Sequence, residues 1–200
     1  MKDYSIKDQI YCYENTLILK NKLNIKNKEE LEIVETKITS FKIAELQKRE
    51  FKEYNLNFLF FKNLHKFIFE DLFEWAGKIR IIDISKDSFK FAHHIYIEKE
   101  ASKLFNQLKK ENYLKNIKKE DLIKKISHYI TEINVLHPFR EGNGRTIREY
   151  FRILLQNLDY KINFNIKNKQ KYIEAMIESP YDQKNLIKFL KENIKKLEEK

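Results

Sequence analysis

The sequence predicts a mainly α-helical protein, a bundle of helices that carries one small β-hairpin. Apolar residues recur at the three- to four-residue spacing of helices through most of the 200 residues, and a shorter, strand-like period is confined to about residues 79–91. Hydrophobic residues make up 42% of the chain, which suffices for one sizeable core, and no Gly/Ser-rich linker divides it. We therefore expect a single domain over residues 1–200.

The first two helices are predicted from caps and apolar stripes. Asn27 is a favourable N-cap for a helix that begins at Lys28. The apolar stripe of this helix is Leu31, Val34, Ile38 and Phe41, extended by Ala44 and Leu46. A second helix is expected from about Asn57 to Phe73, and Gly77 is expected to end it, because glycine commonly follows a helix. The inward residues of the second helix are Phe60, Leu64, Phe67 and Ile68.

Residues 79–91 are expected to form a hairpin. Alternating residues from Ile79 to Ile84 lead into the polar run Ser85–Ser88, which is followed by Phe89–Phe91. Two short β-rich runs on either side of a polar turn are typical of a hairpin.

The rest of the chain is predicted to be helical. The expected helices run from about Ile97 to Lys110, from Lys118 to Leu136, from near Asn143 through Leu155, from Lys169 to Glu178 and from Asp182 to Glu199. Pro138 stops the second of these, since the residue before a proline is disfavoured in a helix. Lys161–Ile166 is expected to be an irregular or extended link.

Composition excludes several classes of protein. Cys12 is the only cysteine, so disulfide frameworks and thiolate metal sites are excluded. The sequence has no run of about 20 apolar residues, and residues 1–10 lack a signal-peptide pattern, so we expect a cytoplasmic protein without a membrane partner. The net charge is +10, but basic and acidic residues are interleaved, which makes nucleic acid an unfavoured partner.

One segment concentrates the rarest residue types of the chain. Only six of the 40 basic residues are arginine, and four of them lie between Arg140 and Arg152. Two of the three glycines, Gly142 and Gly144, and one of the two prolines lie in the same region. Arginine binds phosphate in a bidentate manner, whereas lysine is a point charge. We therefore place the functional site in residues 137–148.

The chemistry of this segment favours phosphoryl or nucleotidyl transfer. Glycines allow the loop to take positive φ, and the N-terminus of the following helix can bind an anion. Arg145 and Arg148 share a helix face and can hold one polyphosphate. Glu141 is placed to hold Mg²⁺ between phosphates, and His137 can act as a neutral base.

Residues 137–148 read HPFREGNGRTIR, and this run resembles the signature HPFx[D/E]GN[G/K]RxxR of the Fic (filamentation induced by cAMP) family at every specified position. Further segments that look like the bacterial members are residues 13–23, 65–77 and 84–86. The resemblance implies a Fic-type helical bundle in which an anion nest joins two helices. It also implies a protein adenylyltransferase, which transfers AMP from ATP to a Tyr, Thr or Ser hydroxyl of a target protein.

The resemblance also implies the role of each residue. His137 would deprotonate the target hydroxyl, and Glu141 would bind Mg²⁺ between the α- and β-phosphates. Gly142, Asn143 and Gly144 would form the anion nest, with Asn143 near the α-phosphate. Arg145 and Arg148 would hold the β- and γ-phosphates, and Arg148 mainly the γ-phosphate.

The family's flap and its regulation are further implications. The hairpin around Ser85 and Lys86 would be the flap that registers the target beside the nucleotide by strand-like pairing. Many members silence themselves through a motif [S/T]xxxE[G/N], and no such motif occurs in this sequence. We therefore expect a toxin of a toxin–antitoxin pair, with inhibition by a separate small antitoxin.

Other hypotheses remain open beside that of a protein adenylyltransferase. The same site could transfer UMP or phosphate, or the chain could be a non-catalytic basic binding module. Arg140 and Arg152 are either substrate contacts or surface charges, and the stripe Tyr172, Ile173 and Met176 is a core stripe or an adenine wall, the core being favoured. The pair His93 and His94 is not predicted to bind a metal, because no further ligand pair is evident at a helical or turn spacing.

Overall fold

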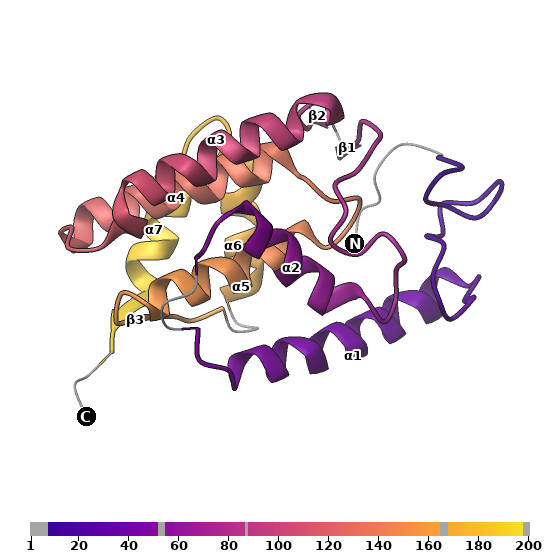
Figure 1. Ribbon diagram of the computed structural model, residues 1–200, viewed down its shortest axis with the longest axis horizontal. Helices are drawn as coiled ribbons and strands as arrows, with labels where there is room; N and C mark the ends of the chain where they lie inside the picture. Colours follow the sequence, from indigo (N-terminus) through magenta and orange to yellow (C-terminus); the bar gives the residue numbers. More distant parts are fainter. Residues whose placement is uncertain (1–7, 52–54, 87, 165–167, 198–200) are drawn as a thin grey trace.

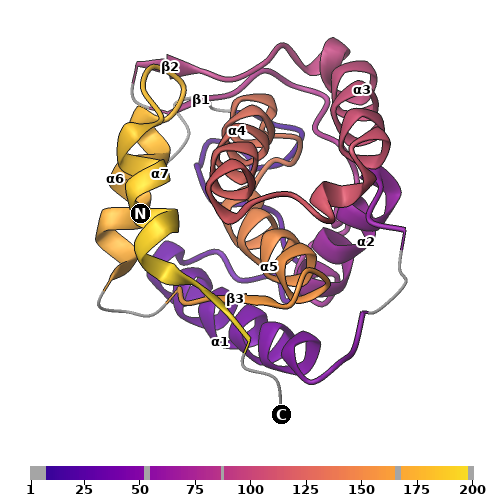
Figure 2. The ribbon, with the colours of Figure 1, turned by 90° about the vertical axis from the view of Figure 1, so that its left-hand side faces the viewer.

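The computed structural model describes residues 8–51, 55–86, 88–164 and 168–197. Two helices, α4 (Lys119–Leu136) and α5 (Asn143–Gln156), lie at the centre of the bundle (Figure 2). The helices around them are α1 (Lys28–Gln47), α2 (Phe58–Phe69), α3 (Ile97–Lys110), α6 (Lys169–Glu178) and α7 (Lys184–Asn193). Short 3₁₀ turns at His94–Tyr96 and Asn112–Leu114 precede and follow α3.

The outer helices enclose α4 and α5 from several sides. Helix α2 packs on α5, α3 and α7 pack on α4, and α6 packs on α7. Helix α1 packs on α2 and runs along one edge of the molecule (Figure 1). The small flap hairpin β1 (Ser85–Lys86) and β2 (Phe89–Lys90) lies near the start of α3. The loop between α4 and α5 is therefore held by the two most enclosed helices of the bundle.

Helix α5 is enclosed because its apolar residues point in several directions. The side chains that are fully buried in it are Ile147, Tyr150, Phe151, Ile153, Leu154 and Leu155. Phe139, in the loop before α5, is also fully buried and stacks on Phe61 of α2 with ring centroids 5.6 Å apart. Burial of these side chains fixes both ends of the loop that joins α4 to α5.

Most predicted helices are confirmed, and the differences have local causes. Helix α2 ends at Phe69 instead of Phe73, because the chain turns there through a series of tight turns. Gly77 therefore does not cap α2, and its positive φ of 77° serves a later turn. Phe41 is 70% exposed although it continues the apolar stripe of α1, since the inward positions between Leu31 and Leu46 belong to Glu35 and Thr39.

The C-terminal region differs more from the prediction. Helix α7 ends at Asn193 instead of Glu199, and β4 (Ile194–Lys196) follows it directly. Strand β4 pairs antiparallel with β3 (Tyr160–Ile162), so the beginning of the expected Lys161–Ile166 link is a strand. This pairing joins the segment after α5 to the end of α7. Residues 165–166 and 198–199 of these expectations lie outside the described residues.

The hairpin is confirmed at its centre and is shorter than expected. Ser85 pairs with Lys90 and Lys86 with Phe89, while residues 79–84 form no strand. Asp87, in the expected turn, lies outside the described residues. Among the residues that the structure describes, no helix is long and apolar enough to span a lipid bilayer.

Candidate functional site

His137 ends α4 in the left-handed conformation, with φ 45° and ψ 63°. Only 7% of the residue is exposed. Nδ1 lies 3.0 Å from the carbonyl oxygen of Asn134, and since a carbonyl can only accept, Nδ1 carries the proton. The Phe91 ring stacks on the imidazole at 3.8 Å. Nε2 is then the nitrogen with the basic lone pair.

Burial, together with the nearby charges of Arg80 and Lys86, lowers the pKa of His137 to about 3 against the opposing effect of the hydrogen bond to Asn134. A lowered pKa keeps the imidazole neutral near pH 7. The expectation of a neutral base at this position agrees with this direction. The Nε2 lone pair of the neutral imidazole is therefore the available acceptor for a hydrogen bond or a proton.

Arg80 holds the hairpin against the end of α4, a role that we did not predict from the sequence. Its side chain is almost fully buried. Nε donates to the carbonyl of His137 at 2.8 Å, and the two terminal nitrogens donate to the carbonyls of Ile82, Ala92 and Leu136. Its backbone N–H also donates to Pro138. One side chain thus joins both legs of the flap to the end of α4.

The loop after His137 is closed by Asn143, the first residue of α5. The Asn143 carboxamide oxygen accepts from the Phe139 N–H at 2.9 Å, and its nitrogen donates to the Phe139 carbonyl at 2.7 Å. The side chain is therefore committed to the loop itself. The N–H groups at the start of α5 have no partner within the helix, as at any helix N-terminus, and this helix end could therefore bind an anion.

The two glycines of the loop have different roles. Gly142 is the N-cap of α5 with φ 83°, and a Cβ there would lie 2.3 Å from the Phe69 ring. Gly144 is not at positive φ, contrary to the expectation for both glycines. A Cβ at Gly144 would meet only the Arg148 guanidinium at 3.6 Å. Gly142 is required by the turn, whereas Gly144 leaves space beside Arg148.

His65 of α2 supports the loop from behind, and it too had no assigned role. Its Nδ1 accepts from the Gly77 N–H at 2.8 Å, so Nε2 carries the proton and donates to the Glu141 carbonyl at 2.9 Å. The ring is fully buried and stacks on Phe139 at 3.8 Å. Burial lowers the pKa of His65 to about 3, which keeps it neutral. His65 fixes the backbone that carries Glu141.

Arg145 lies between two carboxylates. It forms an ion pair with Glu35 of α1, and its other terminal nitrogen donates to Thr39 at 3.1 Å. Glu141 lies 3.6 Å from the same guanidinium and accepts from the Gly142 N–H at 2.8 Å. Burial raises the pKa of Glu35, although the Arg145 charge opposes this shift. Helix α1 thereby contributes a charged residue to the site that the local motif does not contain.

Arg148 lies one turn further along α5. Its guanidinium carbon is 6.0 Å from the ring centroid of Tyr172 in α6, a cation–π distance. Tyr172 and Met176 belong to the core, which agrees with the favoured interpretation of that stripe. Burial lowers the pKa of Arg148, which is still a cation at neutral pH. Arg145 and Arg148 thus share one side of α5, as their spacing predicted, but they have different neighbours.

The other two arginines of the cluster have structural partners. Arg140 is 4% exposed and pairs with Asp8, at 3.0 Å between Nε and Oδ2. Arg152 pairs with Glu149 within α5 at 2.7 Å. Arg140 is therefore not a surface charge. It anchors the N-terminal segment to the loop.

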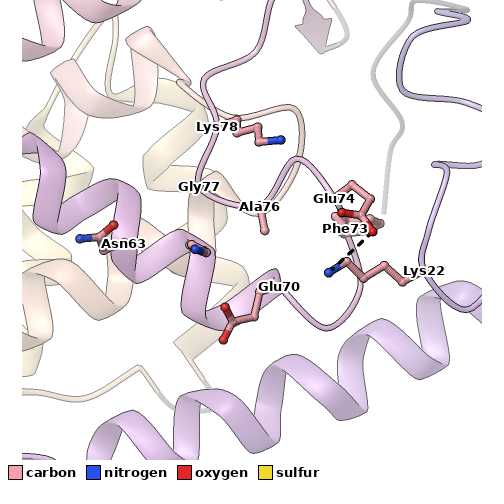
Figure 3. Close-up of a pocket in the computed structure, with 9 residues that line it drawn as sticks. Lys22, Asn63, Glu70, Phe73, Glu74, Ala76, Gly77 and Lys78 are labelled. Carbon is pink, nitrogen blue, oxygen red and sulfur yellow. Dashed lines mark ion pairs between the residues drawn. The ribbon is translucent and has the colours of Figure 1, made fainter.

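A separate surface pocket contains none of the signature residues. Figure 3 shows it beside the end of α2, where Lys22 and Glu74 approach each other to 3.8 Å. Its lining includes several lysines and glutamates but no histidine and no arginine. The candidate site is instead defined by the loop between α4 and α5.

Glu141 fits the role of a magnesium ligand by its chemistry. It offers a hard carboxylate oxygen directly before the N-terminus of α5, with 19% of its side chain exposed. Mg²⁺ in nucleotide sites is held by one or two carboxylates together with phosphate oxygens and water. One partly exposed carboxylate beside a phosphate site is therefore a suitable protein contribution.

Comparison with known proteins identifies relatives of the chain. Residues 55–155 match the model of the family described as Fic/DOC family. The chain is 36% identical over 191 residues to protein adenylyltransferase VbhT of Bartonella schoenbuchensis, of which it spans only 40%. It is 33% identical to probable protein adenylyltransferase y4lH of Sinorhizobium fredii, with 90% of this chain and 92% of that protein covered. Probable protein adenylyltransferase Fic of Escherichia coli is 32% identical, with 82% and 81% covered.

Solved structures share the fold. A BepC protein of Bartonella tribocorum with bound AMPPNP superposes with a TM-score of 0.89 at 22% identity, covering 96% of this chain and 99% of that one. An N-terminal Fic domain of Bartonella quintana with bound ADP gives a TM-score of 0.86 at 24% identity, with 96% and 97% covered. The mainly helical fold with a short hairpin is thus confirmed.

Proposed function

This chain belongs to the Fic/DOC family and is a nucleotidyltransferase, and we propose that it transfers AMP from ATP to a hydroxyl side chain of a target protein. The observation that carries this proposal is the pairing of a neutral, buried His137 with the anion-binding start of α5. The curated relatives are named protein adenylyltransferases. Neither the loop nor its neighbours identify adenine by themselves, so the base is assigned from the relatives.

In the proposed reaction, His137 activates the target hydroxyl and AMP is transferred to it. Nε2 of His137 takes the proton of the target hydroxyl, and the oxygen attacks the α-phosphorus of ATP. The bond from the α-phosphorus to the bridging oxygen breaks, and diphosphate leaves. The carbonyl of Asn134 holds Nδ1–H, so the imidazole keeps the tautomer needed for the reaction. His137 is thus the catalytic base.

The phosphates are held at the start of α5. The backbone N–H groups of Gly142, Asn143 and Gly144 and the helix dipole stabilise the negative charge around the α-phosphate. Asn143 contributes its backbone, since its side chain closes the loop. Arg148 binds mainly the γ-phosphate, and Arg145 holds the β-phosphate while it remains fixed by Glu35.

Magnesium completes the charge balance in this proposal. Glu141 would hold the ion, which neutralises phosphate charge and favours departure of diphosphate when it is bound. The protein's own contribution is to orient the Glu141 carboxylate. The Gly142 N–H, the Arg145 guanidinium and the His65 contact to its carbonyl all restrict that residue.

The flap is assigned to the target. The pairing of Ser85 with Lys90 and of Lys86 with Phe89 gives a short hairpin, and Phe91 at its base stacks on His137. An extended target segment pairing with this hairpin would bring its Tyr, Thr or Ser hydroxyl toward Nε2. In this proposal the protein itself acts in the cytoplasm.

A toxin role with a separate antitoxin is the regulatory part of the proposal. The motif [S/T]xxxE[G/N] is absent from the sequence, so an inhibitory glutamate for Arg148 would come from another protein. Co-expression with the product of the neighbouring gene should give a stable complex with little transferase activity. No complex and unchanged activity would contradict this part only.

The position of the label on ATP tests the proposed reaction. The purified chain, Mg²⁺ and a bacterial lysate are incubated with ATP labelled at the α- or the γ-phosphate, and in parallel with α-labelled UTP. AMP transfer predicts protein labelling from α-labelled ATP alone. Labelling from γ-labelled ATP would indicate phosphate transfer, and labelling from UTP would indicate UMP transfer.

A further inference from the structure

Three metal-ligating side chains meet at the base of the flap, outside the phosphate site. Asp83 precedes β1, and His93 and His94 follow β2, so the two legs of the hairpin each contribute. One ligand atom of each residue lies within 4.8 Å of the others. Among the described residues, this is the one group of three or more histidine, cysteine or acidic side chains so arranged.

The Asp83 carboxylate faces both imidazoles. Its Oδ1 lies 2.9 Å from Nδ1 of His94 and accepts from the His94 backbone N–H at 2.8 Å. Its Oδ2 lies 3.4 Å from Nε2 of His93. The two rings are stacked with centroids 4.8 Å apart. The carboxylate and both ring nitrogens therefore converge on one small volume that is open to solvent.

We propose that Asp83, His93 and His94 bind one zinc ion, which joins the two legs of the flap. Two imidazoles and one carboxylate form a donor set that suits Zn²⁺, with a fourth position left for water. Ligand atoms about 2.0–2.2 Å from a tetrahedral ion lie roughly 3.4 Å apart. Nε2 of His93 already lies 3.4 Å from Oδ2 of Asp83, and the three ligand atoms all lie within 4.8 Å of one another, so rotation of the exposed rings would bring the remaining separations to that value.

Proton balance allows this binding. Nδ1 of His93 now accepts from the Ile95 N–H at 3.4 Å, a long contact, so the proton is on Nε2. On zinc binding the proton of each ring moves to its other nitrogen through solvent, and the freed lone pair binds the ion. The Asp83 carboxylate supplies the third ligand atom. Zinc binding would therefore break only the contact between His93 and the Ile95 N–H and the direct hydrogen bonds from the two rings to Asp83.

The neighbouring charge of Arg80 does not prevent this arrangement. Its guanidinium lies 3.8 Å from Oδ1 of Asp83, and it already donates to backbone carbonyls on both legs of the flap and at the end of α4. Arg80 approaches Oδ1, whereas Oδ2 faces His93, so Oδ2 is the oxygen that would bind zinc. The ion would then reinforce from outside the connection that Arg80 makes from within, and the flap would open less often.

Zinc titration of the full chain without an affinity tag tests this proposal, with calorimetry as readout and no nucleotide or target present. We expect one zinc per chain and a loss of affinity of about tenfold or more in His93→Ala, His94→Ala and Asp83→Asn. The matched controls are His128→Ala, which removes a histidine from α4, and His137→Ala, which removes the catalytic base. Both should bind zinc as the parent does.

Two further results decide the proposal independently of transferase activity. Zinc should slow hydrogen exchange of the amides at residues 84–91 in the parent and leave them unchanged in the double variant His93→Ala/His94→Ala. Circular dichroism verifies that the variants are folded. No zinc binding by the parent, equal binding by the folded double variant, or loss of binding in His137→Ala would overturn it.

Discussion

Glu35 of α1 and Arg145 of α5 form an ion pair between helices that are 110 residues apart in sequence, with only 10% and 17% of the two side chains exposed. The pair joins the peripheral helix α1 to the phosphate end of α5. Thr39, one turn after Glu35, accepts from the same guanidinium. Arg145 is therefore oriented before any nucleotide arrives, and Glu35 is a positioning residue of the proposed reaction.

Glu35→Gln should lower kcat/KM for ATP about tenfold, because Arg145 loses its charged partner and its orientation. It should also destabilise the fold by about 2 kcal/mol, less than for a fully enclosed pair, since both side chains retain some exposure. Glu32→Gln, at an exposed position of the same helix, is the control. Steady-state kinetics and urea unfolding measure both effects. Equal kinetics for the two variants would contradict the role of Glu35.

Gly142→Ala should destabilise the protein by about 2–4 kcal/mol and abolish transfer. The added Cβ would overlap the Phe69 ring, and φ 83° is unfavourable for alanine. Gly144→Ala is the matched control, because its Cβ has ordinary contact distance to Arg148 and its backbone is helical. Denaturant unfolding of both variants measures the difference. Indistinguishable midpoints would mean that the turn tolerates a side chain.

Arg80→Lys should loosen the flap and cost about 2–4 kcal/mol of stability. Lysine cannot donate to the carbonyls of His137, Ile82, Ala92 and Leu136 at once, so buried acceptors lose their partners. Arg49→Lys, at an exposed arginine that pairs with Glu45, should have almost no effect. Hydrogen exchange at residues 84–91 should accelerate in Arg80→Lys alone. Unchanged protection there would refute the link between Arg80 and the flap.

Stability should fall as the pH drops below about 6.5. Burial lowers the pKa of His65 and His137 to about 3, so the unfolded chain takes up protons at these two residues where the folded chain does not. His137→Ala removes one of these two histidines. The dependence of the unfolding free energy on pH should therefore become less steep, by about 1.4 kcal/mol per pH unit between about pH 6 and about pH 5. Denaturant unfolding at a series of pH values measures this. Parallel curves for the two proteins would contradict the buried neutral state of His137.

The sequence predicts the local parts of the site better than the distant ones. His137, Gly142 and the start of α5 follow from a single stretch of chain, where a proline, glycines and arginines determine the backbone. Glu35 and His65 lie on other helices, and their contacts depend on tertiary packing that no local period reveals. Phe41 illustrates the same limit, since its stripe position points away from the core.

Unlike the contacts of Glu35 and His65, the structural role of Arg80 could have been predicted from the sequence. The chain uses lysine for most of its basic residues, and Arg80 is one of the two arginines outside residues 140–152. The several fixed donors of arginine suit a buried cluster of carbonyl groups as well as they suit a phosphate. The choice of arginine at position 80 therefore indicates a constrained polar contact at the base of the hairpin.

Transfer of label from the α-phosphate of ATP by the parent and by His137→Ala, together with ATP affinity by calorimetry, tests the central claim most directly. We predict that the ATP affinity of His137→Ala is within a few-fold of that of the parent. Its rate of protein labelling should be at least about a hundredfold lower. His128→Ala, which alters a histidine in the middle of α4, should label as the parent does. Labelling by His137→Ala at the rate of the parent would show that His137 is not the base.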